Sequence, residues 1–219
     1  MITSYSIWLI VHLLLFAYWL GGDLGVFYSS FIVVDEKRPI DDRKTAAGIL
    51  VALDRIPRAC LILMLPVGVS LASSMGQIII PAGALGALWM LTAVWLVMLW
   101  KIEATHNATL TKIDAVIRIV VIASLVGFAI AGLNGSATVL SDWVALKMLL
   151  FATAIASGLM IRRVFAPFGP AFGQLVTTGS TPDIERTIDT SLKKARPFVI
   201  LIWGCLIGAA AVAAIKPSF

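Results

Sequence analysis

Six long apolar runs constrain this chain more than any other feature of its sequence. A helix needs about 20 mostly apolar residues to cross the hydrocarbon core of a bilayer. The segments that qualify are Ile7–Ile32, Ile49–Ala72, Ile78–Trp100, Ala115–Leu133, Trp143–Ile161 and Pro197–Ile215. Their apolar residues are continuous rather than alternating, which favours helices over a β-barrel. The sequence therefore predicts an all-α polytopic membrane bundle of about six transmembrane helices, with residues 1-219 forming a single domain.

The composition agrees with lipid as the solvent. Of the 219 residues, 60% are hydrophobic and 13% are charged, whereas soluble domains have about 45–50% and about 25%. The net charge is +5. The basic residues lie between the apolar runs without interleaved stacking aromatics, so we expect no nucleic-acid partner. Cys60 and Cys205 lie inside apolar runs and are too few for a disulfide framework.

Basic residues divide the connections into two sets. Residues 35–44, 101–112 and 162–196 form a set rich in Lys and Arg, whereas the connections and termini of the other set carry Lys216 as their basic residue. The positive-inside rule assigns the first set to the cytoplasm. Both termini then lie outside, which requires an even number of spans. We expect a multi-pass protein of a bacterial-type inner (plasma) membrane, in contact with the lipid bilayer.

The longest cytoplasmic connection, residues 163-194, is expected to contain a short helix. Thr181 followed by Pro182 and Asp183 is typical of a helix start, with Thr as N-cap and Pro in the first turn. A helix is therefore predicted from about Pro182 into the last span, bent at Pro197. The part of the connection before it holds structure-breaking residues, namely Pro167, Gly169, Pro170 and Gly173.

Besides Lys147 of the fifth span, five charged residues lie inside the predicted spans: Asp23, Asp54, Arg55, Arg58 and Arg118. Such residues are costly in lipid and usually face partners or a water-filled cavity. We expect Asp23 to pair with Arg55 and Arg58, which reach a similar depth, and Asp54 to face Arg118. Three interpretations stay open: a buried network that fixes helix register, an anion site open to the cytoplasm for carboxylates or phosphates, or arginines at the interface if the span boundaries are displaced.

The two histidines differ in their surroundings. His12 lies in the outer half of the first span, where Lys147 of the fifth span reaches a comparable depth. A lone histidine on an apolar face is usually hydrogen-bonded within the bundle; the alternative is a cofactor or metal ligand. His106 falls in a cytoplasmic connection at the opposite face, so a six-coordinate haem would need Met, Lys or a second chain as its other ligand.

Several motifs resemble one family. The pattern W-x3-H-x6-W-x-G-G, formed by Trp8, His12, Trp19, Gly21 and Gly22, resembles the first helix of HemJ-type protoporphyrinogen oxidases and of CopD-like copper-resistance membrane proteins. Trp143-x3-Lys147 and the closing Lys216-Pro217 resemble later parts of HemJ. The resemblance implies bound haem b, with His12, Lys147 and Trp19 as cofactor-binding residues and His12 as the metal ligand. An arginine is the alternative to Lys147 as the partner of a haem propionate.

The chain also departs from the HemJ pattern. It lacks the later histidine, since that region reads Ala156-Ser157-Gly158, and Tyr28 stands near the place of an arginine. It has two additional helices over residues 78–133. We interpret it as a relative that kept the scaffold and changed its function.

Three functions follow from these observations. The first is a haem-associated oxidoreductase or electron-transfer subunit. The second is a transporter or permease for an anion or metal ion, with Asp23, Arg55, Arg58 and Arg118 along its path. The third is a non-catalytic membrane anchor or assembly subunit that acts through its cytoplasmic connection. A homo-oligomer or a partner membrane subunit is expected in every case, because thin loops leave little surface for soluble chemistry.

Overall fold

The computed structural model describes residues 3–134 and 141–217, which form a bundle of roughly parallel helices. Within these residues, six helical segments are long and apolar enough to cross a membrane. The prediction of an all-α bundle of about six spans is confirmed. The helices are α1 (Ser4–Val33), α2 (Ile40–Ser74), α3 (Ala82–Thr105), α4 (Ala108–Leu133), α5 (Asp142–Phe165), α6 (Phe168–Thr178) and α7 (Pro182–Ile215).

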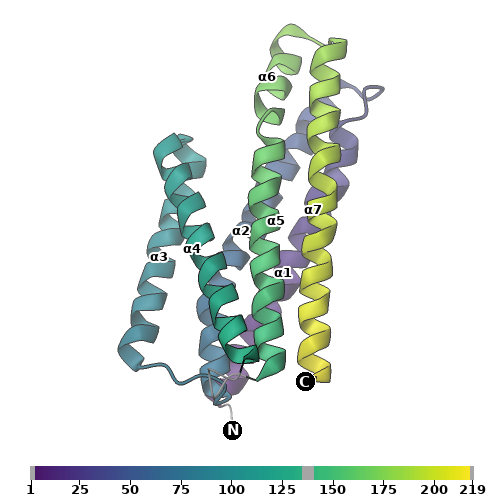
Figure 1. Cartoon of the computed structure of the whole chain (residues 1–219). Helices are drawn as coiled ribbons and strands as arrows, with labels where there is room; N and C mark the ends of the chain where they lie inside the picture. The colour runs from purple at the N-terminus through teal and green to yellow at the C-terminus, as the bar shows by residue number, and fades with distance from the viewer. Residues whose placement is uncertain (1–2, 135–140, 218–219) are drawn as a thin grey trace.

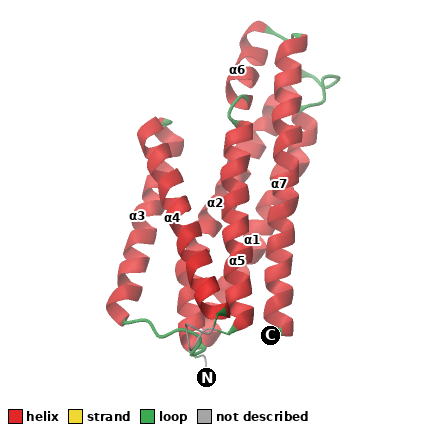
Figure 2. Cartoon of the chain, viewed as in Figure 1, coloured by secondary structure: helices red, strands yellow, loops and turns green. Residues whose placement is uncertain are grey.

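The two termini lie at the same end of the bundle, and α6 lies at the opposite end (Figure 1). Short loops join the long helices (Figure 2). The α1–α2 and α3–α4 connections lie toward the end that carries α6. These connections and the segment around α6 hold the basic residues that the positive-inside rule assigns to the cytoplasm. We call this end the basic end and the end with the termini the outer end.

Local capping residues set where the helices begin. Thr3, Asn107 and Thr181 accept hydrogen bonds from backbone N–H groups in the first turns of α1, α4 and α7. The third helix begins at Ala82 rather than at the predicted Ile78, because Pro81 occupies the position just before its first turn. A proline fits the start of a helix but interrupts the helix interior. Hydropathy therefore found the span, and the proline determined its first residue.

The helices extend beyond the apolar runs toward the basic end. α7 has 34 residues and continues through Pro197, which gives about 51 Å at 1.5 Å per residue. The hydrocarbon core is only about 30 Å thick, so the first part of α7 projects from it. α6 packs against this part. The sequence did not predict α6, but Pro170 lies in its first turn, where the missing N–H has no intrahelical partner to lose.

Small residues allow α1 and α2 to approach closely. A Cβ atom at Gly22 would lie 2.8 Å from Cδ of Pro57, and a Cβ at Gly25 would overlap the end of Leu53. Close approach of backbones at small residues is a common way for helices to associate in lipid. Gly22 is the more stringent position, since the proline ring cannot rotate away.

We predict that Gly22→Ala destabilises the protein, because the new methyl group must displace Pro57 and with it part of α2. Overpacking of this kind typically costs about 1–3 kcal/mol. Gly21→Ala is the matched control, since nothing lies within 4 Å of a Cβ at that position. Thermal unfolding of both variants in detergent measures the difference. Equal midpoints would contradict the close contact.

A buried ion pair joins three helices at the basic end. The guanidinium of Arg43 in α2 donates two hydrogen bonds to Glu185 in α7, at 2.9 and 2.6 Å. Its Nε donates to the carbonyl of Val33 at the end of α1, at 2.9 Å. Ser180 also donates to Glu185. Around this pair, apolar side chains of α1, α2, α6 and α7 form a separate buried cluster, so the projecting ends act as one packed unit.

We predict that Glu185→Gln lowers the free energy of unfolding by about 3–5 kcal/mol, the usual cost of leaving one member of a buried ion pair without its partner. Lys193→Gln on the same helix breaks the exposed pair with Asp189 and should cost less than about 1 kcal/mol. Thermal or denaturant unfolding of the purified variants in detergent provides the measurement. A Glu185→Gln protein as stable as the control would contradict the role of the pair.

The same pair predicts a dependence on pH. Hydrogen bonds from Arg43 lower the pKa of Glu185 below its ordinary value of 4.5. Because the folded-state pKa is the lower one, the stabilisation is complete above the unfolded pKa and is lost as the pH falls through the folded pKa. Wild-type protein should therefore lose stability below about pH 4.5 more steeply than Glu185→Gln does.

Candidate cofactor cavity and arginine cluster

An apolar cavity of about 340 Å³ lies between α1, α2, α4, α5 and α7 in the outer half of the bundle. This volume falls within the range of small-molecule sites, about 300–1,000 Å³. Small residues leave part of the space, because Gly68 of α2 and the alanine-rich end of α7 lie on its wall. Its polar lining side chains include those of Tyr5, His12 and Lys147. We call this space the outer cavity.

The structure brings His12 and Lys147 together on the outer cavity, as the sequence had placed them at comparable depth. The two side chains are close enough to interact electrostatically. Nδ1 of His12 is buried and has no hydrogen-bond partner within the described residues. A Cβ at Gly68 would lie 3.8 Å from Cε1 of His12, so glycine keeps the wall beside the imidazole open. Buried polar atoms are usually hydrogen-bonded, so the lack of a partner for Nδ1 calls for an explanation such as a ligand, a water molecule or a catalytic role.

Positive charge gathers at the outer rim of the cavity. The Nζ atoms of Lys147 and Lys216 lie 5.6 and 5.9 Å from the ring centroid of Trp143, within cation–π range. Three methionines, Met64, Met75 and Met148, also line the cavity. The space therefore has apolar walls with three thioethers, an unpartnered imidazole and a cationic rim.

Trp19, the third predicted cofactor residue, does not line the cavity. Its ring is buried and packs edge-on against Phe151, a lining residue, at a centroid distance of 6.1 Å. Its side chain also forms a hydrogen bond with Asp23. Trp19 therefore supports the cavity wall from behind, and it gives Asp23 one partner. Oδ2 of Asp23 has none within the described residues.

The predicted pairing of Asp23 with the arginines of α2 is wrong. Arg58 pairs with Asp54 one turn earlier on its own helix, and Arg55 reaches Glu103 of α3 at 3.1 Å. Asp54 therefore does not face Arg118 as a partner. These pairings depend on the rotation of each helix about its axis, which hydropathy does not determine.

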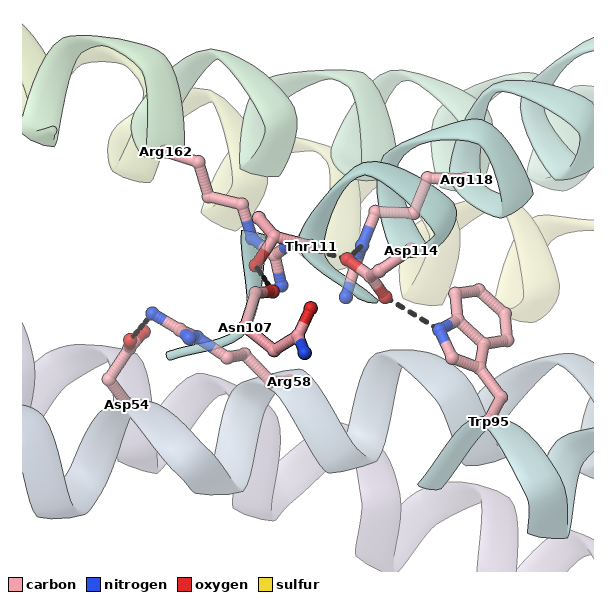
Figure 3. A network of polar contacts seen from close by, with 8 residues as sticks. All are labelled: Asp54, Arg58, Trp95, Asn107, Thr111, Asp114, Arg118 and Arg162. Atoms are coloured by element: carbon pink, nitrogen blue, oxygen red, sulfur yellow. Dashed lines mark hydrogen bonds and ion pairs between the residues drawn. The ribbon is translucent and has the colours of Figure 1, made fainter. Parts of the chain in front are cut away.

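Arg118 instead belongs to a buried network centred on Asp114, shown in Figure 3. Asp114 is fully buried and accepts hydrogen bonds from the indole of Trp95 at 2.6 Å and from Nε of Arg118 at 2.9 Å. Arg162 of α5 forms an ion pair with the same carboxylate. The guanidinium of Arg118 also lies 5.5 Å from the ring centroid of Trp95. One carboxylate thus connects α3, α4 and α5.

Sequence reasoning missed Asp114 and Arg162 for a simple reason. Each lies one residue outside a predicted span, which began at Ala115 or ended at Ile161. Arg162 was therefore assigned to a connection, and Asp114 was left between the connection over residues 101–112 and the fourth span. The i, i+4 spacing of Asp114 and Arg118 was the available signal, because such residues are neighbours on a helix surface.

No cluster of three or more His, Cys, Asp or Glu side chains in the described part of the chain could hold a metal ion. His12 is therefore a single candidate ligand, and another donor must complete any metal site around it. Met64, Met75 and Met148 are the thioethers on the same cavity.

The six apolar helices and their internal polar sites define a multi-pass integral membrane protein. No family model, curated protein or solved structure matches the chain. The resemblance to HemJ-type and CopD-like proteins therefore stays a prediction.

We predict that Asp114→Asn strongly destabilises the bundle. The asparagine keeps the shape but removes the charge shared by Arg118 and Arg162, and leaving such charges unpaired typically costs about 3–5 kcal/mol. Asp54→Asn is the control, because its ion pair with Arg58 is partly exposed and its loss should cost much less. Unfolding in detergent compares the two. Similar losses of stability would contradict the central position of Asp114.

Proposed function

We propose that this membrane protein binds haem b in the outer cavity and serves as an oxidoreductase or an electron-transfer subunit. The observation that carries the proposal is His12, whose buried and unpartnered Nδ1 belongs to a side chain on the wall of an apolar cavity. Histidine is the commonest axial ligand of haem b, and an apolar surrounding is what the porphyrin requires.

The other lining residues fit the same group. Met64, Met75 and Met148 supply thioethers, and His/Met ligation is an established haem pattern. Lys147 and Lys216, near Trp143 at the rim, are the cations placed to pair with propionate carboxylates. A haem needs an apolar pocket for its ring and cations for its propionates. The outer cavity has apolar walls in its interior and lysines at its outer rim.

The residues of this chain would have distinct roles. Haem would supply one-electron redox chemistry. His12 would hold the iron, Lys147 and Lys216 would orient the propionates, and the apolar walls would exclude water and so influence the redox potential. Gly68 keeps space beside the imidazole. Trp19 acts indirectly, by fixing Phe151 in the wall.

This function accounts for the cavity better than transport or anchoring does. Leu125 of α4 lines the cavity, and Arg118 lies about two helical turns away toward the basic end. The apolar core that includes Leu61, Ile62 and Ile155 belongs to the layer between them. Such a layer favours a resident bound group over an ion path. An anchor needs no cavity with an unpartnered histidine.

We predict that protein purified after haem-replete expression shows a Soret band and that His12→Ala abolishes it. His106→Asn is the matched control, because His106 ends α3 at the basic end with a left-handed backbone, φ 48°, that asparagine tolerates. Absorbance spectra of equal amounts of folded protein give the comparison. A change in spin state in Met64→Leu, Met75→Leu or Met148→Leu would identify that methionine as the second ligand.

Colourless wild-type protein under these conditions would reject the haem proposal. Retention of the full Soret band in His12→Ala would reject His12 as the ligand. Size-exclusion chromatography of each variant separates loss of haem from loss of folding.

A further inference from the structure

Three arginines from three different helices approach one another in the basic half of the bundle. They are Arg58 of α2, Arg118 of α4 and Arg162 of α5, and Figure 3 shows their side chains on facing helices. Arg162 is close enough to both of the others to interact with them electrostatically. We call these three residues the arginine cluster.

The arginine cluster carries more positive charge than its acids neutralise. Asp114 is shared by Arg118 and Arg162, and Asp54 pairs with Arg58. Three guanidinium groups therefore face two carboxylates. Like charges inside a low-dielectric bundle repel strongly, so the excess charge calls for a further anion.

A specific donor in the cluster is also unused. The side chain of Arg118 is only 3% exposed, and its Nη2 has no hydrogen-bond partner within the described residues. An unsatisfied buried donor on a charged group carries a substantial desolvation cost. Trp95 and Asp114 hold this guanidinium in place through its ring contact and its Nε, which leaves Nη2 available.

Access to the cluster comes through its other two members. The side chains of Arg58 and Arg162 are 34% and 24% exposed. Arg162 lies in the last turn of α5, at the basic end of that helix. Arg55 is not part of this arrangement, because it pairs with Glu103.

We propose that the arginine cluster binds a phosphate group, with Arg118 as the buried donor and Arg58 and Arg162 as the partly exposed ones. Arginine is the preferred residue for phosphate because its planar group offers several parallel N–H donors. Three cations from separate helices suit a tetrahedral anion better than a flat carboxylate. The phosphate belongs either to an anionic phospholipid of the adjoining leaflet or to a small soluble molecule. This site is independent of haem binding.

The experiment measures the thermal unfolding midpoint of the purified full chain with two probes. One arm adds inorganic phosphate to protein in neutral detergent, against sodium chloride at equal ionic strength. The other compares nanodiscs of phosphatidylcholine with nanodiscs that contain phosphatidylglycerol. We expect the midpoint to rise with the concentration of at least one probe. A rise with phosphate identifies a soluble anion, and a rise with phosphatidylglycerol alone identifies a headgroup.

Variants separate a site from a general charge effect. The charge-matched double variant Asp114→Asn with Arg118→Gln should lose the rise in midpoint, and Arg162→Gln should reduce it. Arg55→Gln, which removes one positive charge outside the cluster, should retain it. The Soret absorbance of folded Arg162→Gln should equal that of wild type, which keeps this test separate from the haem proposal.

Two results would overturn the site. One is an unchanged wild-type midpoint with both probes. The other is an equal rise in wild type, Arg162→Gln and the folded double variant. If the double variant does not fold, Arg162→Gln against Arg55→Gln decides, since Arg162 is partly exposed and its removal leaves Arg118 paired with Asp114.

Discussion

A charged side chain inside a lipid-embedded bundle must find its partner within the bundle, and this constraint orders the basic half of the structure. Asp114 shows its effect most clearly, since it accepts hydrogen bonds from Trp95 and Arg118 and pairs with Arg162. A rotation of α3, α4 or α5 would leave a charge or a polar donor against lipid at a cost of several kcal/mol. The carboxylate therefore determines which face of each of these three helices points into the bundle.

Packing in the rest of the bundle depends on small residues instead. Gly22 and Gly25 allow α1 to lie against Pro57 and Leu53 of α2, and a Cβ at Gly208 of α7 would already touch Leu150 of α5. Van der Waals contact of this kind is the main force between helices in lipid, where apolar burial gains little. The α7 alanines beyond Gly208 do not fill the space in front of them. Small side chains thus allow close contact between helices at one depth of the bundle and leave space for the outer cavity at another.

Hydropathy was sufficient to predict the six spans, because lipid directly imposes the length and apolar character of each one. Local chemistry then located Thr181 as the start of α7. The partners in the ion pairs could not be predicted from hydropathy or local sequence. Arg55 and Arg58 are about 60° apart around a helix, yet Arg55 reaches Glu103 and Arg58 turns back to Asp54. Choosing between such partners requires the rotation of each helix, which is determined by tertiary contacts that leave no periodic signal.

The depth of each polar group decides which ligand it can serve. The sequence allowed either Lys147 or an arginine to neutralise a propionate beside His12. In the structure, Arg118 lies about two turns from the cavity wall at Leu125, toward the basic end. Lys147 and Lys216 lie on the cavity. The proposed haem would therefore lie with its charged edge toward the outer rim, and the proposed phosphate would approach the arginine cluster from the basic end.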